Sequence, residues 1–185
     1  MSIYKKTLVE EAEKYGWGLI LIHRNEFNNF IDSLLKKFNK IRLLDIGAWK
    51  CMLGDYLKEN FGDKIEYVGV DVIDLPDRIK DYEFYVMTGD SLLFPPNSFH
   101  AVVFIETLEH IVDYVRALRE AYRVLVSGGG IFIQSVICTD NNALLDRTHY
   151  HVLHPVTLKR LMEWIGFSNI EYKESGNFAI WGYKV

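Results

Sequence analysis

The strongest constraint on the fold is a short apolar run, residues 41–46, that ends next to Gly47. Its sequence, Ile-Arg-Leu-Leu-Asp-Ile, describes a buried strand that carries an acid near its carboxyl end and then turns at a glycine. An amphipathic segment, 52–60, follows, and a second apolar run, 65–70, ends at Asp71. Because strand, helix and strand in this order predict a parallel βαβ unit, the chain is expected to form an α/β domain.

The rest of the chain continues this alternation. Three more strands are expected in its middle, at 83–87, 101–105 and 131–137. Helices are expected where apolar residues recur at helical spacing, at 27–38, 111–125 and 155–165. The glycine-rich run 127–130 is expected to end the second of these helices, and a turn at 175–177 to join 169–173 and 178–184 into a hairpin. The predicted fold is α/β: a Rossmann-like, doubly wound, seven-stranded sheet, mostly parallel, with an antiparallel C-terminal hairpin strand.

Length and composition favour a single domain, 1–185, in which a helical N-terminal segment, 1–40, precedes a cofactor-binding core, 41–185. The net charge of −4 argues against a nucleic-acid partner, because nucleic-acid-binding proteins usually carry a basic excess. Cys51 and Cys138 are too few for a disulfide framework and fit reduced thiols. The charged N-terminus and the short apolar runs indicate neither a secretory signal nor a membrane span. We therefore expect a cytoplasmic protein without a membrane partner; its oligomeric state stays open.

Five short motifs follow one another along the expected strands and turns. They are Leu44-Asp45-Ile46-Gly47, Tyr67-Val68-Gly69-Val70-Asp71, the run 89–99, Glu106-Thr107-Leu108-Glu109-His110, and the run 123–129. In this order and at this spacing the chain resembles the class I S-adenosylmethionine-dependent methyltransferases, of the type 11 and type 23 group, over residues 40–185. The resemblance implies a transferase that uses S-adenosyl-L-methionine and releases S-adenosyl-L-homocysteine.

The resemblance also implies which residues bind the cofactor: Asp45, Gly47, Ala48, Asp71, Val72, Gly89, Asp90, Ser91 and Glu106. All lie at or after the carboxyl ends of expected strands, where ligands of such sheets bind. Gly47 would let the backbone approach the methionine end, Asp71 would accept both ribose hydroxyls, and Asp90 would accept from the adenine amino group. The alternatives are local, because Asp71 could cap the next turn and Asp90 could form an Asx-turn.

The candidate catalytic residues are histidines: His110, His149 and His151. Methyl transfer is an in-line displacement that needs a base only when the acceptor is a neutral hydroxyl or a similar group. In an extended stretch His149 and His151 would face the same side. A small-molecule acceptor is expected, and the sequence does not distinguish O-, N- and C-methylation.

An alternative function involves a divalent metal ion. Glu106, Glu109 and His110, with a later histidine, resemble the set that holds a metal in small-RNA 3′-end 2′-O-methyltransferases, and they also resemble ubiquinone-type O-methyltransferases. The Leu-Glu-His pattern is, however, common in the family without a metal, where the glutamate complements a helix N-terminus. We therefore assign no metal ligands from the sequence and keep the metal-dependent enzyme as an alternative.

The first motif departs from the family pattern at Trp49 and Cys51, where small residues are usual. If the position of Trp49 needs a left-handed backbone, its side chain costs about 1–2 kcal/mol. This departure motivates a second alternative, a catalytically silent methyltransferase-like binding protein. Trp17 is the one candidate for an aromatic lid over the cofactor.

Overall fold

The computed structural model describes Thr7, Glu10 and residues 18–185. Trp17, the candidate lid residue, lies outside the described residues, as does most of the N-terminal segment before it.

A central sheet organises the described part of the chain, with seven strands in the order β3-β2-β1-β4-β5-β7-β6. The strands are β1 (Ile41–Ile46), β2 (Ile65–Asp71), β3 (Glu83–Val86), β4 (Phe99–Ile105), β5 (Leu125–Ser135), β6 (Phe167–Ser175) and β7 (Asn177–Lys184). β1 to β5 run parallel to one another, whereas β7 runs antiparallel to both of its neighbours, β5 and β6. The predicted mostly parallel sheet with a C-terminal antiparallel hairpin is confirmed.

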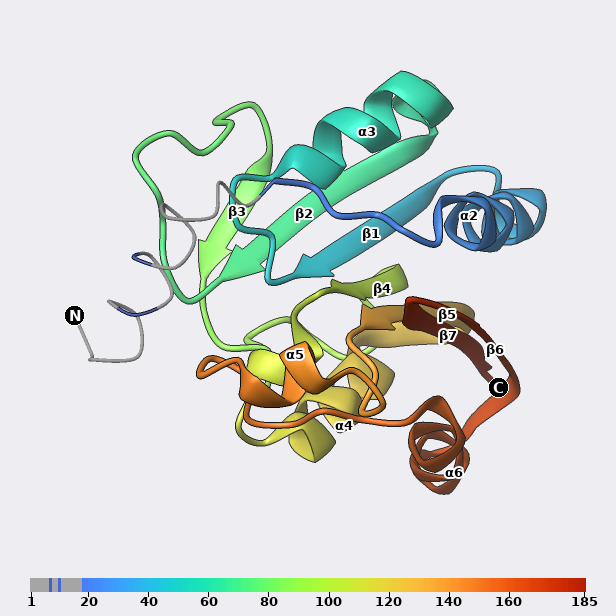
Figure 1. Ribbon diagram of the computed structural model, residues 1–185. Helices are drawn as coiled ribbons and strands as arrows, with labels where there is room; N and C mark the ends of the chain where they lie inside the picture. Colours follow the sequence, from blue (N-terminus) through green and yellow to red (C-terminus); the bar gives the residue numbers. More distant parts are fainter. Residues whose placement is uncertain (1–6, 8–9, 11–17) are drawn as a thin grey trace.

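Helices cover both faces of this sheet, which makes the fold doubly wound (Figure 1). Those of the described residues are α2 (Arg24–Phe38), α3 (Met52–Phe61), α4 (Tyr114–Val124), α5 (Asn141–Leu145) and α6 (Pro155–Ile165), with short 3-10 turns at Gly62–Lys64 and Leu108–His110. In Figure 1, α2 and α3 lie above the sheet and α4 and α6 below it. Pro155 begins α6, where its missing N–H has no helical partner to lose, and Gly166 ends it.

The alternation of side chains along the strands builds a separate core on each face. Leu43 packs into the core beneath α2 and α3, and its neighbour Leu44 packs into the core against α4 and α6. On the first face Phe132 of β5 contacts the rings of Phe27 and Phe30, with centroids 5.2 and 5.6 Å away. Both cores bury the middle of the strands, so polar side chains and backbone groups without a strand partner lie at the strand ends.

The glycine run 127–130 corrects one prediction. It does not end a helix; α4 stops at Val124 and β5 begins at once with Leu125, so the glycines lie inside the strand. A Cβ on Gly130 would lie 2.6 Å from a ring atom of Phe30, and one on Gly129 would lie 2.8 Å from the carbonyl oxygen of His100. The glycines therefore permit close packing within the sheet, a tertiary demand that outweighs their usual role at helix ends.

One helix boundary differs from the prediction, and one short helix was not predicted. The long helix begins at Tyr114 rather than at residue 111, because the 3-10 turn Leu108–His110 and an extended Ile111 precede it. Asp113 caps the helix by accepting from the N–H of Arg116. The short helix α5, within 138–154, was not predicted, since that segment has no apolar periodicity.

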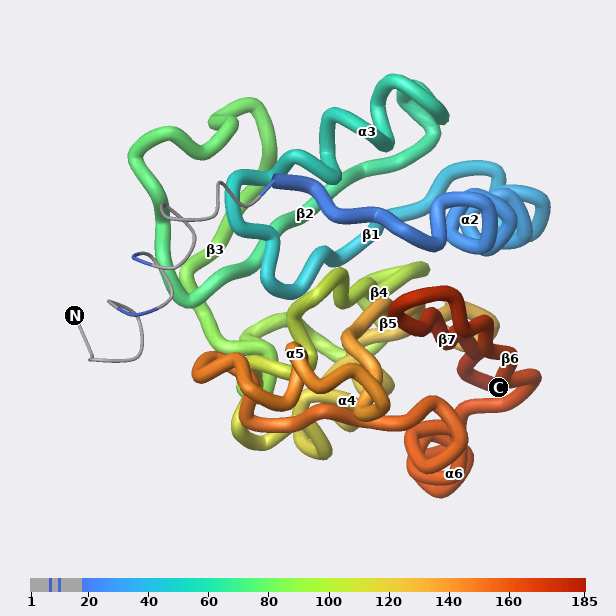
Figure 2. The backbone as a smooth tube through the Cα atoms, viewed as in Figure 1, coloured from blue at the N-terminus to red at the C-terminus, as the bar shows by residue number. Residues whose placement is uncertain are grey.

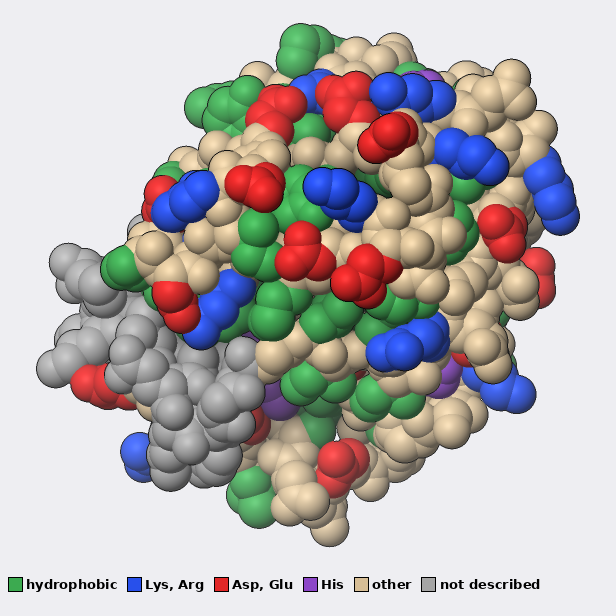
Figure 3. Space-filling view, turned by 90° about the horizontal axis from the view of Figure 1, so that it is seen from above, with side chains coloured by type: hydrophobic (Ala, Val, Ile, Leu, Met, Phe, Trp, Pro, Cys, Tyr) green, Lys and Arg blue, Asp and Glu red, His purple; other side chains and the backbone are tan. Residues whose placement is uncertain are grey.

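The carboxyl ends of β1, β2 and β3 point to one side of the molecule, the left in Figure 1. The loop 72–82 and the segment that carries α5 lie at this side (Figure 2). On the face seen from above in Figure 3, Lys and Arg side chains are interspersed with Asp and Glu. No helix within the described ranges is long and apolar enough to cross a membrane.

Candidate functional site

A cavity of about 480 Å³ opens beyond the carboxyl ends of β1, β2 and β4. The structure brings most of the predicted site residues to its wall: Asp45, Gly47, Ala48, Asp71, Val72, Gly89, Asp90, Glu106, His110 and His149. Ser91 and His151 do not line it. Apolar groups make up most of the remaining wall, among them Met87, Ile111 and Val112. The cavity thus has the position that doubly wound sheets give to their ligands.

The turn after β1 is fixed against β2 by backbone hydrogen bonds. The N–H groups of Gly47 and Ala48 both donate to the carbonyl oxygen of Val70, at 2.9 and 3.0 Å. Gly47 has a φ of +83°, and a Cβ there would lie 2.2 Å from the Oγ1 of Thr107. Only glycine fits this position, because a side chain would strain the backbone at this φ and would clash with Thr107, which follows β4.

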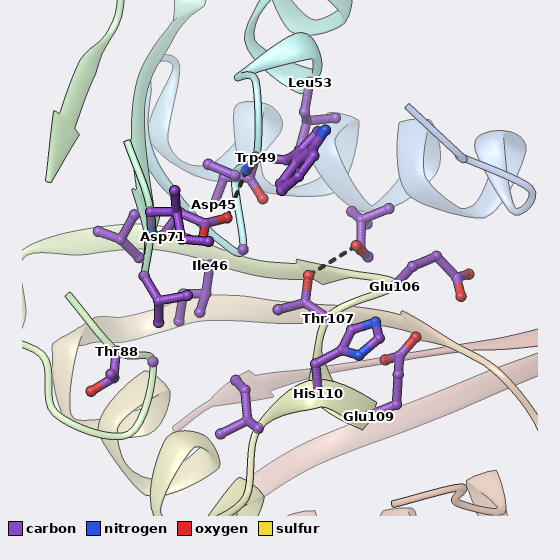
Figure 4. A pocket seen from close by; sticks show the side chains of 18 of the residues that line it. Asp45, Ile46, Trp49, Leu53, Asp71, Thr88, Glu106, Thr107, Glu109 and His110 are labelled. Carbon is purple, nitrogen blue, oxygen red and sulfur yellow. Dashed lines mark hydrogen bonds between the residues drawn. The ribbon is translucent and has the colours of Figure 1, made fainter. Parts of the chain in front are cut away.

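The departures at Trp49 and Cys51 both adopt the left-handed conformation, with φ of +47° and +63°. A non-glycine residue there costs about 1–2 kcal/mol. The backbone N–H of Trp49 donates to the Oδ2 of Asp71 at 2.9 Å, and its indole extends toward Leu53 at the cavity wall (Figure 4). Trp49 therefore contributes a wall to the cavity while its backbone keeps the turn that the motif requires.

Asp45 contributes to the cavity wall but is almost completely buried, at 3% exposure, beneath this turn. Its Oδ2 accepts the hydroxyl of Tyr67 at 2.6 Å. Burial raises the pKa of Asp45 to about 7, the Tyr67 hydrogen bond opposes this shift, and the nearby charge of Asp71 adds to it. Through this hydrogen bond, Asp45 connects the end of β1 to β2.

Asp71 links the loops on either side of the cavity. Its Oδ2 accepts from Trp49, and its Oδ1 accepts from the N–H of Ile73 at 3.2 Å, so the carboxylate does cap the following turn. Each carboxylate oxygen has a second lone pair, and the group can accept from a ligand as well. Asp90 lies in the turn where the N–H of Ser91 donates to the carbonyl of Thr88.

Glu106 lies at the far end of the cavity with a left-handed backbone, φ +49°. Its Oε1 accepts two amide N–H groups, one from Gln134 and one from Asn177, each at 2.7 Å. The same Gln134 amide donates to the carbonyl of Ile20 at 2.7 Å, and its oxygen accepts from the N–H of His23 at 3.0 Å. Gln134 therefore joins Glu106 to the segment 18–23 that enters α2.

Glu109 lies beside Glu106 and is buried. Its Oε2 accepts the hydroxyl of Ser135 at 2.9 Å, whereas its buried Oε1 has no hydrogen-bond donor among the described residues. Burial raises the pKa of both glutamates to about 7, and the charge of Glu109 adds to the shift at Glu106. Two adjacent buried carboxyl groups repel one another when both are ionised, so this end of the cavity favours a proton or another cation.

His110 and His149 face each other across this end, with ring centroids 5.0 Å apart. Nδ1 of His110 contacts the carbonyl of Thr148 at 2.9 Å, and Nδ1 of His149 contacts that of Ala143 at 2.8 Å. Since a carbonyl oxygen only accepts, each Nδ1 carries a hydrogen, and the Nε2 of His149 lies 3.8 Å from Oδ2 of Asp146. Burial also lowers the pKa of His110, which favours its neutral form.

His151 lies apart from this pair. Its Nε2 contacts the carbonyl of Val112 at 2.7 Å, and its ring packs on Tyr114 at 4.5 Å. Its catalytic role, like that of the other histidines, stays a prediction.

The sequence reasoning missed Gln134, Ser135 and Asn177, which hold the two glutamates. A polar Gln-Ser pair at the end of the otherwise apolar β5 was the available signal.

The chain is similar to known proteins both in sequence and in fold. A sequence profile described as "Methyltransferase domain" matches residues 22–172. No curated protein matches the chain. Solved structures with the same fold include a SAM-dependent methyltransferase, possible histamine N-methyltransferase, from Thermotoga maritima (TM-score 0.71, 19% identity, 98% of each chain covered). A SAM-dependent methyltransferase from Archaeoglobus fulgidus is also similar (TM-score 0.66, 20% identity, 84% of this chain and 94% of that chain).

A phosphoethanolamine N-methyltransferase 2 of Haemonchus contortus in complex with S-adenosyl-L-methionine is similar as well (TM-score 0.66, 17% identity). It is covered over 52% of its length, and 85% of this chain is covered. At these identities the structural matches establish the fold.

The buried Asp45 predicts a pH dependence of stability. Its raised pKa means that the folded state binds a proton more tightly than the unfolded state, so the stabilisation is complete below about pH 4 and is lost as the pH rises through about 7. Between pH 5 and 8 the wild type should lose about 2–3 kcal/mol of unfolding free energy that Asp45→Asn retains. Urea unfolding at both pH values measures this, with exposed Asp63→Asn as the matched control. If wild type and Asp45→Asn lost the same unfolding free energy between pH 5 and 8, the prediction would be contradicted.

Proposed function

The chain belongs to the methyltransferase-domain family, the class I S-adenosylmethionine-dependent methyltransferases, and from this premise we propose that it transfers a methyl group to a small-molecule acceptor in the cavity. The observation that carries the proposal is the meeting of the Gly47 turn, Asp71 and Asp90 at one wall, with polar, buried groups at the other end. The first set suits a nucleoside cofactor, and the second suits the acceptor.

The residues present fit S-adenosylmethionine. The bare backbone at Gly47 leaves room for the methionine end, Asp71 is a two-oxygen acceptor for the ribose hydroxyls, and Asp90 can accept from the adenine amino group. When bound, the cofactor supplies an activated methyl group on a sulfonium sulfur.

The protein's contribution would then be placement. Holding the acceptor in line with the methyl group supplies about 7–11 kcal/mol of the barrier. His110 and His149 line the cavity, and on this proposal one of them takes a proton from an acceptor that must lose one.

The role of Asp71 is tested by titration with S-adenosylhomocysteine. The wild type should bind it, and Asp71→Ala should bind about 10–100-fold more weakly, because hydrogen bonds to a charged group contribute about 1.5–3 kcal/mol. Asp71→Asn, which keeps one acceptor, should lose less. Asp77→Ala, an exposed acid in the next loop that pairs with Lys50, should bind like the wild type. Calorimetry that detects no binding to the wild type would refute the proposed function.

The left-handed Trp49 gives a second test. Trp49→Gly should bind S-adenosylhomocysteine no more weakly than the wild type, because glycine adopts the same turn without strain. Trp49→Ala is the matched control: it also loses the indole but keeps a Cβ at positive φ. The Gly variant should therefore exceed the Ala variant in unfolding free energy by about 1 kcal/mol. A less stable Gly variant would show that the turn does not carry this strain.

A second candidate function, a metal-dependent O-methyltransferase of ubiquinone-type molecules or RNA ends, is supported by one cluster. Ligand atoms of Glu109, His110 and His149 all lie within 4.8 Å of one another. The Oε1 of Glu109 has no donor within residues 18–185, and both imidazoles donate their Nδ1–H to carbonyls, as metal-binding histidines commonly do. Two nitrogens and a carboxylate oxygen suit ions such as Mn²⁺ or Zn²⁺.

This candidate is tested by thermal unfolding with MnCl₂. Saturating metal should raise the melting temperature by about 5–10 °C, and Glu109→Gln and His149→Ala should abolish the rise. His151→Ala, outside the cavity, should keep it. An unchanged melting temperature of the wild type would count against the metal. Methyl transfer to any acceptor would, for its part, exclude the third possibility, a silent binding protein.

A further inference from the structure

The charge of the cavity wall is one-sided. Its described residues include carboxyl groups but neither lysine nor arginine; the acids are Asp45, Asp71, Asp90, Glu106, Glu109 and Asp146. The first three surround the part assigned to the cofactor, and the last three lie with His110 and His149 at the other end. An anionic acceptor, such as a carboxylate or a phosphate ester, would meet like charge there, with no lysine or arginine among the described wall residues to compensate it.

In both Glu106 and Glu109, one carboxyl oxygen already accepts hydrogen bonds from other side chains. Two amides hold Oε1 of Glu106, and a hydroxyl holds Oε2 of Glu109. These bonds fix both carboxyl groups in place. These bonds do not involve Oε2 of Glu106 or the buried Oε1 of Glu109, and no residue in the described part of the chain donates to that Oε1. A ligand with several N–H donors and a positive charge would satisfy both oxygens and compensate the repulsion between the two groups.

We propose that the acceptor is an organic amine, held as its ammonium ion between Glu106 and Glu109, so that the protein is an N-methyltransferase. This inference rests on the proposed function and deepens it. An ammonium group has three N–H donors, two of which match the carboxyl oxygens of Glu106 and Glu109. The apolar wall at Met87, Ile111 and Val112 suits the carbon skeleton of such an amine.

The chemistry balances without a further reagent. The ammonium first gives one proton to water or to a cavity carboxylate. Its nitrogen then forms the new N–C bond while the S–C bond breaks, and the electron pair of that bond stays on sulfur.

An amine would contact Glu106, whereas a metal ion held by the candidate ligand group would not. The group whose ligand atoms could share one ion consists of Glu109, His110 and His149, and it does not include Glu106. The two amide donors on Glu106 orient its carboxylate beside Glu109 instead. Both glutamates therefore contribute to the proposed ammonium site. The experiment below also tests whether a metal ion occupies this position instead.

Matched probes on two skeletons test the proposal: phenethylamine, 2-phenylethanol and phenylacetate, and the corresponding imidazole compounds, histamine, imidazole-ethanol and imidazole-acetate. Each is titrated by calorimetry into protein saturated with S-adenosylhomocysteine, in buffer containing EDTA. On at least one skeleton the amine should bind about tenfold or more tightly than the alcohol, and the acid should not bind. Glu106→Gln and Glu109→Gln should each weaken the amine by about tenfold without weakening the alcohol. Exposed Glu171→Gln is the matched control.

The outcomes separate this inference from the proposed function. Failure of S-adenosylhomocysteine to bind refutes the proposed function before any probe is added. With S-adenosylhomocysteine bound, an alcohol or acid that binds as tightly as its amine on both skeletons overturns the amine site alone, as does failure of both amines to bind. Amine binding that appears only when EDTA is replaced by MnCl₂ also overturns it, in favour of the metal.

Discussion

The cavity depends on how the turn after β1 is held against the end of β2. Two N–H groups of this turn donate to Val70, and a third, from Trp49, donates to the Asp71 carboxylate. These bonds join two parallel strands at the one point where the ladder between them has ended. Without them the Gly47 turn would have no fixed position, and the acids at the strand ends would not share a wall.

The same constraint explains why a bulky residue is tolerated inside the first motif. Trp49 is needed for its backbone donor, which any residue other than proline provides, and its side chain leaves the turn toward Leu53. The cost of the left-handed conformation is confined to the backbone and is small beside the stability of a folded domain. A departure from a glycine pattern is therefore weak evidence against a cofactor site when the hydrogen bonds of the turn are intact.

The architecture was largely predictable because strand and helix patterns are local. Apolar runs that end in Asp45 and Asp71 predicted the parallel sheet, and the tail predicted its antiparallel hairpin. The role of the glycines in β5 was predicted wrongly, because it depends on Phe30. The ring of Phe30 packs on Gly130 but lies about a hundred residues away in the chain. Likewise Gln134 and Asn177 were not foreseen as partners of Glu106, since nothing near them in the sequence indicates which carboxylate they will meet.

Gln134 couples the position of the segment 18–23 to the orientation of the Glu106 carboxylate. One buried amide binds Ile20, His23 and Glu106 at once. If the segment 18–23 separated from the sheet, the amide would lose two of these three bonds and be free to rotate, and the carboxylate of Glu106 would lose one of its two fixed donors. The segment forms part of the cavity wall at Ile20. Glu106 would then keep only Asn177 as a fixed donor, so the orientation of its carboxylate beside Glu109 depends on how the segment 18–23 packs on the sheet.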